Sequence, residues 1–521
     1  MFGDFSPRLK GTYNQNPLLT NEFLNVKQFG AKGDGVSNDT AAITAADVAA
    51  RAVGRALYFP GGIYMATQLT VYTSSWWFGD GRNNSVLSQI IGSNIDFIYG
   101  NNSAANWGQT SGITTYVDGY GLFGLTINGG YNSGSGGNTS GSGIAIFGSK
   151  PVMRDIFITQ CAGYGMRTEW YDVGPELFGM EGHWDDVRIS LCGEHGWLMN
   201  GPHDSVALGV IISGAGQAAT NTWDGLNIGT QGSCTFIGCH TYDANATNHR
   251  YAVNDNAGCM FGGGCQFEGG ATANAIFNGA SRSLIDPSVR FYSNTGTTSI
   301  IISQPTTFYG SIEEPYSGTT SLGIKLGVGG DNASDCVIKC NCVNQGNGVI
   351  DMTNSQGGNI IDINGYTSAG SGWVGYPNSY DQVVLNVNIA GSFASLRNVV
   401  GGVSQFGDIV FANGGVDDLV GPNTTPAGTT QGTATVLSAY GTNVCTTTAS
   451  GTGVSLPTSS NFAIGRTMLM HNWGANALKV YPESGSQISP LATNAALSIP
   501  TLKSALLRRY SATQWGYILS A

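Results

Sequence analysis

Short apolar segments recur along the middle of the chain, and this recurrence limits the folds that the chain can adopt. The segments begin at residues 143, 165, 196, 224, 251, 274, 299 and 348. Most are followed by a second apolar segment, such as "DIFITQC" or "DVRISLC". An uneven repeat of roughly 22 to 31 residues, with insertions at the turns, is typical of a solenoid. The sequence therefore predicts an all-β solenoid in which parallel strands stack from coil to coil.

The composition agrees with many short strands joined by tight turns. Glycine is the commonest of the 521 residues, at 78, and charged residues make up 11%, against about 25% in ordinary soluble domains. The net charge of −11 argues against nucleic acid and against an anionic membrane surface as partners. No apolar run approaches the length of about 20 residues that a membrane span requires. We see no secretory signal at the N-terminus, because no apolar stretch follows a basic start.

The ten cysteines match no zinc-ligand spacing, and we predict no metal site and no disulfide framework. Cys161 and Cys192 lie at equivalent positions before successive coils, as Cys239 and Cys265 do within theirs. We expect them to be free, buried side chains in internal stacks. No organic cofactor is indicated.

The stretch "FGAKGDGVSNDTAA", residues 29 to 42, superficially resembles a phosphate-binding or calcium-binding loop. A phosphate loop needs Ser or Thr after Gly-Lys, whereas Lys32 is followed by Gly33 and Asp34. A calcium loop needs alternating acids and a distal Glu, which are absent. The glycines predict a turn with positive φ angles. Asn38 or Asp39 then serves as the N-cap of a helix over "TAAITAADVAARAV".

The motif "NVKQFGAKGDGVSNDTAAITAA", followed by "ALYFPGGIY", resembles the N-terminal signature of pectate-lyase-like right-handed β-helices, which is common in bacteriophage tailspikes. The resemblance covers about residues 25 to 82. It implies a right-handed parallel β-helix, an N-terminal helix that covers its open end without performing chemistry, and a homotrimer. The motif is therefore interpreted as architecture.

We expect five segments along the chain. They are an attachment or linker segment at 1–24, the N-terminal cap at 25–82, the β-helix shaft at 83–410, a linker at 411–430 and a C-terminal β-domain at 431–521. The last segment alternates apolar and polar residues in short runs, which predicts a small antiparallel β-domain. Its resemblance to modules that end phage tail proteins implies trimerisation or glycan contact.

The resemblance implies a polysaccharide substrate, and glycoside hydrolysis needs two carboxyl groups, one of them protonated. Acids are densest between residues 165 and 204, where aromatic side chains able to stack on sugars also gather. Exposed acids at turns are commonly only solvated, and a Trp in a coil is often core. The candidate catalytic residues are Glu169, Asp172, Glu181, Asp185, Asp186 and Asp204. The candidate substrate contacts are Trp170, Tyr171, Trp184, Trp197, His183, His203, Arg167 and Arg188.

A second set of acids lies further along the chain. It consists of Asp243, Glu268, Glu313 and Glu314, and Asp243 is expected to pair with Glu268 along one face, one coil apart. The family's catalytic residues vary in position, so neither set is assigned by motif.

The leading hypothesis is a homotrimeric phage tailspike that binds and depolymerises bacterial capsule or O-antigen. It would be held on the phage tail or baseplate and act outside the cell at the host surface. Hydrolysis is favoured because positive residues are scarce near the acids, while Arg154, Arg167 and Arg188 keep elimination by a lyase open. A non-catalytic adhesin with the same shaft predicts acids that point to different faces. A secreted cellular enzyme is a third alternative.

Overall fold

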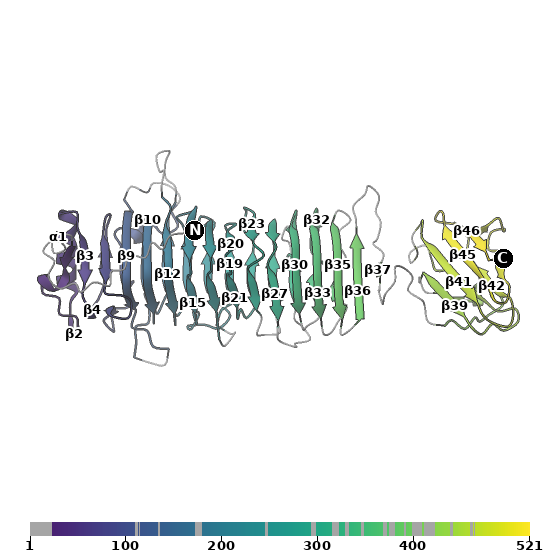
Figure 1. Ribbon diagram of the computed structural model, residues 1–521, viewed down its shortest axis with the longest axis horizontal. Helices are drawn as coiled ribbons and strands as arrows, with labels where there is room; N and C mark the ends of the chain where they lie inside the picture. The colour runs from purple at the N-terminus through teal and green to yellow at the C-terminus, as the bar shows by residue number, and fades with distance from the viewer. Residues whose placement is uncertain are drawn as a thin grey trace, which may run out of the picture. The chain divides into compact units, whose positions relative to one another are not determined.

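The computed structural model (Figure 1) divides into two compact units, residues 1–390 and 391–521. The described residues are 23 to 520 except for 110–112, 114, 134–135, 172–179, 245–247, 293–297, 315–321, 329–332, 345–347, 368–371, 375–380, 390–391, 399–408, 411–422, 438–440, 459–461 and 463. Residues 1–22 of the predicted segment 1–24 and residues 411–422 of the predicted linker 411–430 lie outside this range.

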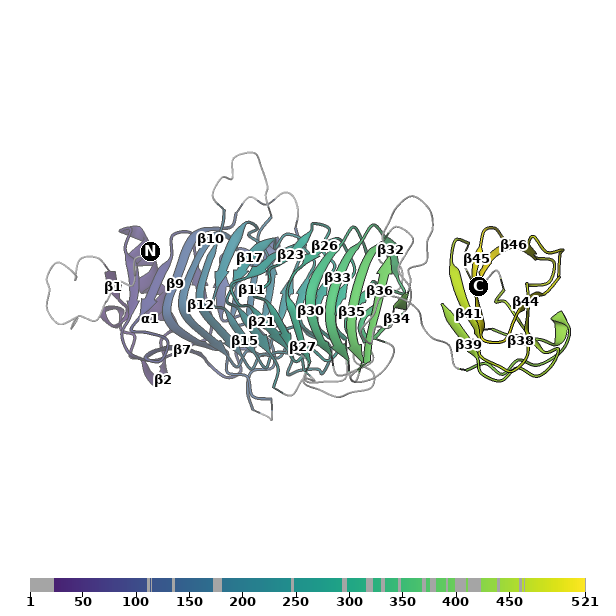
Figure 2. The same cartoon turned by 45° about the vertical axis from the view of Figure 1, so that its right-hand side comes forward.

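The first unit is a parallel β-solenoid with three faces, which confirms the predicted all-β solenoid of parallel strands. Strands of successive coils pair side by side in parallel and in register (Figures 1 and 2). Face 1 contains β1 (Phe23–Asn25), β3 (Ala56–Phe59), β6 (Trp76–Gly79), parts of β9 (Val117–Asn128), β10 (Ile144–Thr159) and β12 (His183–Ser190), β14 (Ser205–Leu208), β17 (Cys234–Ile237), β20 (Met260–Gly262), β23 (Ser283–Ile285), β26 (Thr306–Phe308), and the first parts of β30 (Val337–Asn344), β33 (Ile360–Thr367) and β35 (Gln382–Ile389).

Faces 2 and 3 complete each coil. Face 2 contains the last parts of β9, β10, β12, β30, β33 and β35, together with β2 (Asp34–Asn38), β4 (Gly62–Ala66), β7 (Ser85–Gln89), β15 (Ile211–Ser213), β18 (His240–Tyr242), β21 (Gln266–Glu268), β24 (Arg290–Tyr292) and β27 (Ser311–Glu314). Face 3 contains the first part of β10, together with β5 (Leu69–Val71), β8 (Ile98–Gly100), β11 (Met166–Glu169), β13 (Trp197–Asn200), β16 (Leu226–Ile228), β19 (Tyr251–Asp255), β22 (Ala273–Phe277), β25 (Thr298–Ile302), β28 (Leu322–Leu326), β31 (Gly348–Asp351) and β34 (Gly372–Val374). A small separate pair joins β29 (Ala333–Ser334) and β32 (Ser355–Gly357).

The corner between faces 1 and 2 is sharp because one residue in each coil adopts a positive φ angle. Gly124, Asp155, Asp186, Gly209 and Gly238 occupy this corner in successive coils, with φ between 50° and 62°. Glycine and aspartate tolerate this conformation better than most residues do. The corner therefore gives Asp155 and Asp186 a structural role.

The N-terminal motif folds as a turn followed by a helix. The glycines at 30, 33 and 35 have φ of 96°, 63° and 75°, as predicted, and α1 spans Thr40–Ala52. Asp39 is the N-cap by position, but its carboxylate accepts the Lys32 and Gly33 N–H groups at 2.8 and 3.0 Å instead. Asn38 Oδ1 accepts the Thr40 N–H at 3.0 Å. The motif thus joins the glycine turn to the start of the helix.

Helix α1 lies at the N-terminal end of the solenoid (Figure 1) and packs against β1, β3 and β5. Asp47, which is buried, accepts the indole N–H of Trp77 at 2.7 Å and the Ser75 hydroxyl at 3.1 Å. Its carboxylate also pairs with Arg51 at 2.7 Å. Two shorter helical turns occur, η1 (Val26–Phe29) and α2 (Ser103–Asn106). That α1 serves as a cap stays a prediction.

The interior of the solenoid is filled by apolar and aromatic side chains. Trp184 packs edge-on against Trp197, with ring centroids 4.9 Å apart, and Trp197 packs in the same way against Phe236 at 6.2 Å. All ten cysteines are free and buried, as predicted, and the Cys239 N–H donates to Cys265 Sγ at 3.3 Å. The stacked cysteines therefore belong to the packed core.

The second unit contains an antiparallel pair, β36 (Ser392–Asn398) and β37 (Ile409–Val410), and two small sheets. One sheet joins β38 (Thr435–Val436), β40 (Gly453–Ser455), β42 (Leu478–Tyr481) and β44 (Leu497–Ile499). The other joins β39 (Thr442–Cys445), β41 (Thr467–Asn472), β45 (Lys503–Arg509), β46 (Gln514–Leu519) and β43 (Gln487–Ser489); the turn η2 (Gln431–Thr433) precedes both sheets.

The prediction of a purely antiparallel C-terminal domain is wrong. β38, β40 and β42 pair in parallel, as do β39 with β41 and β43 with β46. Only β42–β44, β41–β45 and β45–β46 among the described strands of the two sheets are antiparallel. Alternation of apolar and polar residues reports one buried face in either arrangement, so it cannot distinguish them. The buried side chains of this unit include Phe462, Met470 and Trp515.

Candidate functional site

A column of polar residues lines the edge where the chain enters face 3. Asp96, Ser142, Tyr164, His195 and Asp224 occupy equivalent positions in successive coils. The residue that follows each of the first four donates its N–H to the carbonyl oxygen of the next member, at 2.8 to 3.2 Å. We call these five residues the polar column.

Glycine follows most members of the column, for a steric reason. A Cβ atom at Gly165 would lie 2.3 Å from Cγ2 of Ile189, and one at Gly196 would lie 2.3 Å from Cγ2 of Ile212. The interior side chains therefore leave no space at these positions. The chain turns there, with apolar residues entering the core after the glycine and the polar residue remaining at the edge.

Glu194 lies beside this column and is half-buried. Burial raises the pKa of its carboxyl group, while the Tyr164 hydrogen bond and the Arg167 charge lower it and the charge of Asp96 raises it. The backbone holds Glu194 on both sides: its N–H donates to Gly163 O at 3.1 Å, and its carbonyl accepts from the Gly216 N–H at 2.8 Å. A fixed carboxyl group with a raised pKa is suited to donating a proton.

Arg167 brings a positive charge to the same region of face 3. Its guanidinium contacts Glu169 Oε1 at 2.5 and 2.8 Å and lies 4.0 Å from the ring centroid of Trp107. The other oxygen of Glu169 accepts the Gly108 N–H at 3.1 Å, and Glu169 is 5% exposed. Glu169 is therefore engaged on both oxygens, and it positions Arg167 rather than facing a substrate.

His195 is a neutral hydrogen-bonding group. Its Nδ1 accepts the backbone N–H of Asp224 at 2.8 Å, and burial lowers the pKa of the ring. The single ring proton therefore resides on Nε2. Aromatic rings enclose the imidazole, with Tyr164 stacked at 5.6 Å and Trp223 edge-on at 5.1 Å between centroids.

Asp224 is the buried anchor of the column. Its side chain is inaccessible to solvent, and Arg250 binds its two oxygens at 3.0 and 2.8 Å. The side-chain amides of Asn227 and Asn254 also donate to it, at 2.6 and 3.1 Å. Both its oxygens accept hydrogen bonds within the protein, which makes it a positioning group.

The side chains around Glu194 include a proton donor, a positive charge and aromatic surface. Burial, and then the charge of Glu194, raises the pKa of Tyr164, which keeps its hydroxyl protonated. Asp96, whose Oδ1 accepts the Ser142 N–H at 2.8 Å, is the carboxylate on a preceding coil whose charge raises the pKa of Glu194. Within the described part of the chain, no three His, Cys, Asp or Glu side chains gather as a metal site. No helix of that part is long and apolar enough to span a bilayer.

The acids and arginines predicted between residues 165 and 204 do not form one site. Asp185 lies on face 1, where Arg154 binds it at 2.7 Å. Asp186 occupies the corner, held by Arg82 at 2.9 Å and Arg188 at 3.4 Å. Because this stretch winds through all three faces, neighbours in sequence point in different directions.

Other predicted members of the stretch are scattered too. Glu181 and His183 are exposed. His203 Nδ1 and Asp204 Oδ2 lie 2.9 Å apart in a loop, where the Asp204 side chain is 69% exposed. Asp172 lies outside the described residues.

The prediction that Trp170, Trp184 and Trp197 contact sugar is wrong, because the three side chains are buried. Trp184 and Trp197 have no exposed surface and form part of the core. Trp170 is 1% exposed in a cluster with Ile113, Phe147 and Met180, against which Tyr171 packs. Large aromatic side chains fill the wide interior of the coils, so these rings are not available to a ligand.

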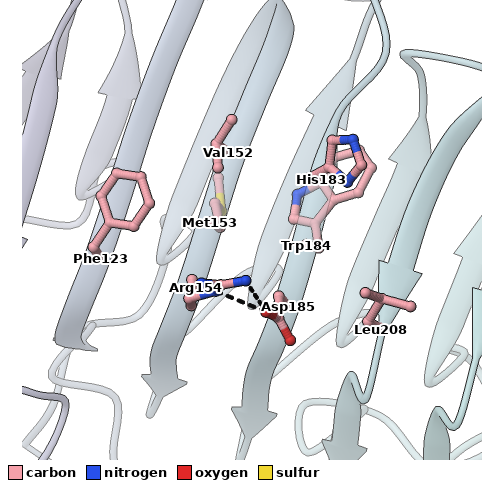
Figure 3. Close-up of a pocket in the computed structure, with 8 residues that line it drawn as sticks. All are labelled: Phe123, Val152, Met153, Arg154, His183, Trp184, Asp185 and Leu208. Carbon is pink, nitrogen blue, oxygen red and sulfur yellow. Dashed lines mark hydrogen bonds and ion pairs between the residues drawn. The ribbon is translucent and has the colours of Figure 1, made fainter. Parts of the chain in front are cut away.

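Figure 3 shows the residues that line a hollow on face 1, and three of them, His183, Trp184 and Asp185, are predicted site residues. Its volume is about 270 Å³, and its lining is Phe123, Val152, Met153, Arg154, His183, Trp184, Asp185 and Leu208. Only one carboxylate lines it. A two-carboxylate mechanism is therefore not available in this hollow.

The second set of acids is partly brought together on face 2. Glu268 and Glu313 occupy the same row, separated by Tyr292, so their backbones are two coils or roughly 9.6 Å apart. His240 Nε2 contacts Glu268 at 2.8 Å. The expected partner Asp243 is instead 2% exposed and accepts the Asn248 N–H at 2.7 Å, because it follows the strand and turns inward. The side chain of Glu314 lies outside the part of the chain that the structure describes.

Sequence reasoning missed Asp96, Tyr164, His195 and Asp224, and it did not select Glu194. A signal was present: the recurring segments at 143, 165 and 196 begin with glycine, and the residue before each glycine is polar. Comparing the residues that precede the first glycine of each coil would have identified the polar column.

Comparisons with known proteins find similarity over part of the chain. Residues 23–243 match the model of the rhamnogalacturonase A/epimerase, pectate lyase-like family. Mannuronan C5-epimerase AlgE5 of Azotobacter vinelandii is 33% identical over 155 residues, which are 27% of this chain and 15% of the relative. A glucan 1,3-beta-glucosidase of Cochliobolus carbonum is 34% identical over 95 residues, 18% of this chain and 11% of the relative. The chain thus spans a small part of these curated relatives.

Solved structures with a similar trace share little sequence. The A-module of A. vinelandii mannuronan C-5 epimerase AlgE4 aligns with a TM-score of 0.48 and 16% identity, covering 69% of this chain and 99% of that one. The Dettilon tailspike protein gp208 aligns with a TM-score of 0.45 and 12% identity, covering 73% and 77%. The family match confirms the resemblance to pectate-lyase-like β-helices over residues 23–243, the segment that contains Glu194 and the whole polar column.

Proposed function

We propose that the protein binds a bacterial surface polysaccharide across face 3 and cleaves it by glycoside hydrolysis, with Glu194 as the proton donor. The observation that carries this proposal is the half-buried Glu194, whose pKa is raised by burial, beside Tyr164, Arg167 and Asp96. The matching family is named for rhamnogalacturonase, and the two curated relatives are named for mannuronan and glucan. These names support a polysaccharide as the substrate class.

In the proposed reaction, Glu194 protonates the glycosidic oxygen as the bond to the sugar carbon breaks. Asp96 is the second carboxylate, which takes a proton from the water molecule that attacks that carbon, so that the hydroxyl group joins the sugar and the protonated leaving group departs. Tyr164 donates a hydrogen bond to the Glu194 carboxylate that remains after proton transfer. Arg167 and the rings of Trp107 and Trp223 would orient the sugar by charge and stacking.

Elimination is disfavoured by the state of the two candidate bases. Tyr164 has a raised pKa, so its hydroxyl is a donor at neutral pH. His195 uses Nδ1 as an acceptor for the Asp224 N–H and carries its proton on Nε2. Neither group offers a free lone pair for taking the proton beside a uronate carboxylate. Arg167, whose positive charge acts on Glu194, is already paired with Glu169.

We further propose that the protein is a phage tailspike: a homotrimer held on the virion tail or baseplate that acts at the host cell surface. This part of the proposal rests on the N-terminal motif and on the solenoid architecture. A trimer is expected to sediment at three times the chain mass of 54.2 kDa. Sedimentation at the mass of one chain would contradict it.

The first experiment incubates the purified protein with a panel of capsular and O-antigen polysaccharides. Chain length, new reducing ends and the ultraviolet absorbance of unsaturated uronates are measured together. Hydrolysis predicts shorter chains and reducing ends without absorbance. Glu194→Gln is expected to lower kcat at least 100-fold with little change in KM, because general acid catalysis contributes about 10²- to 10⁴-fold.

The matched control is Glu181→Gln, an exposed acid of the same stretch, for which wild-type kcat is expected. The wild-type rate is also expected to decline as the pH rises past the raised pKa of Glu194, since the acid must be protonated. Absorbance of unsaturated uronates would overturn hydrolysis in favour of elimination. Full activity of Glu194→Gln would remove Glu194 from the mechanism.

A second candidate function is that of a non-catalytic adhesin. The distribution of Glu169, Asp185 and Asp186 over different faces and corners is the arrangement that an adhesin predicts. Binding of a polysaccharide without any shortening would favour this alternative and would contradict the role given to Glu194.

A further inference from the structure

We propose that the hollow on face 1 is a second polysaccharide-binding site, which holds a stretch of the chain without cleaving it. The ligand class rests on the function proposed above. The hollow lies on a different face from the polar column: the first part of β10 belongs to face 3, whereas the parts of β10 and β12 that line the hollow belong to face 1.

An aromatic pair lies at one end of this hollow, where Phe123 is part of the lining. Trp76 and Phe123 stack with centroids 6.0 Å apart and an interplanar angle of 14°. Trp76 is 38% exposed. A Cβ atom at Gly121 would lie 2.4 Å from the Trp76 ring, so the glycine allows the indole to lie flat on the strand. Flat, accessible rings of this kind bind the apolar face of a sugar.

Polar groups follow directly along the solenoid. Phe123, Arg154, Asp185 and Leu208 are in register on four adjacent strands, as Figure 3 shows, and extend over roughly 14 Å. Arg154 and Asp185 are 57% and 36% exposed. Exposed ion pairs contribute about 0–1 kcal/mol, so sugar hydroxyls can share these groups at little cost.

The charge of the hollow favours a polyhydroxylated ligand over a highly charged one. Arg154 and Asp185 neutralise each other, and His183 is the other polar side chain of the lining. The elongated row suits an extended ligand that crosses several coils. With a single carboxylate, the hollow lacks the pair that hydrolysis requires. It therefore binds the polymer and leaves cleavage to the polar column.

The test uses the full chain carrying Glu194→Gln, so that the polymer stays intact. Binding to each immobilised capsular or O-antigen polysaccharide of the panel is measured before and after adding Phe123→Ala or Arg154→Ala. At least 10-fold weaker binding is expected for both. Met260→Ala is the matched control, because Met260 is a 50% exposed side chain of face 1 outside the hollow, and its binding is expected to be unchanged. Melting temperature reports whether each variant is folded.

In the otherwise wild-type chain, kcat on short fragments is expected to stay unchanged in Phe123→Ala, while KM for the long polymer rises. Unchanged binding with normal cleavage would overturn the second site and leave the proposed function intact. Weakened binding in a protein that never cleaves would support the second site and refute hydrolysis. A lower oligomeric mass of Phe123→Ala by light scattering would overturn the proposal and assign the surface to a second copy. Binding to no polysaccharide would overturn both proposals.

Discussion

Because of the buried His249, we expect the protein to lose stability at acidic pH. The ring is inaccessible to solvent, and its Nε2 accepts the Ala215 N–H at 3.0 Å. Burial lowers its pKa from 6.5 to about 4, against the opposing charges of Asp243 and Asp224 and with a smaller lowering contribution from His195. Protonation would remove the acceptor and place a charge in the interior.

The magnitude follows from the pKa difference between the folded and unfolded states. One pKa unit corresponds to 1.36 kcal/mol, so this histidine contributes about 3 kcal/mol to stability at neutral pH. Because the folded pKa is depressed, the contribution is complete above pH 6.5 and is lost as the pH falls toward 4. The loss also affects the candidate site, since Ala215 precedes Gly216, which binds the Glu194 carbonyl.

The assay is urea unfolding of wild type and His249→Gln at pH 7.5 and pH 4.5. Glutamine keeps an acceptor oxygen near the place of Nε2 but does not titrate. Wild type is expected to lose about 2–3 kcal/mol more than the variant between these pH values. The control His183→Gln alters an exposed histidine and should behave as wild type. If wild type and His249→Gln lost equal stability on acidification, the assignment of the effect to this buried ring would be refuted.

Two further substitutions test the packing of the site. Asp224→Ala removes the carboxylate that binds Arg250, Asn227 and Asn254. We expect the free energy of unfolding, measured in urea, to fall by about 3 kcal/mol. This is the lower end for a broken buried ion pair, because Arg250 is 37% exposed and can be solvated. A loss under about 1 kcal/mol would contradict its role as anchor. Gly196→Ala is expected to lower stability by about 1–3 kcal/mol, because the added methyl group overpacks against Ile212. The control Gly432→Ala has no atom within 4 Å of its added Cβ, and its stability should stay within about 0.5 kcal/mol of wild type. Equal melting temperatures of the two variants would contradict this account.

The fold was predictable because solenoid packing repeats a local pattern. Each coil buries apolar side chains against the next, so the recurrence in sequence reports the stacking directly. The glycine turn and α1 were predictable from local chemistry, because positive φ angles and helix formers act over a few residues. The Asp39 side chain was harder to place, since its bonds to Lys32 and Gly33 depend on how the turn returns to the helix.

The candidate site was less predictable, because density of acids along the chain differs from density in space. Asp185 and Asp186 are adjacent in sequence, yet one lies on face 1 and the other at a corner. Asp96 and Glu194 are almost 100 residues apart, yet the charge of one raises the pKa of the other. The two residues come near each other only because of the way successive coils stack. Insertions of irregular length between the strands hide this stacking in the sequence.

A solenoid also offers a reason why binding and cleavage would occupy different faces. The same position recurs in every coil, so an elongated polymer can meet equivalent side chains along any face. Most of these positions carry apolar or neutral residues, as on face 1 around Phe123 and Leu208. A half-buried carboxyl such as that of Glu194 is costly without partners, and it is tolerated here because Tyr164 and Arg167 share its surroundings. Cleavage is therefore expected where this costly group is supported, and binding can extend over the faces that lack it.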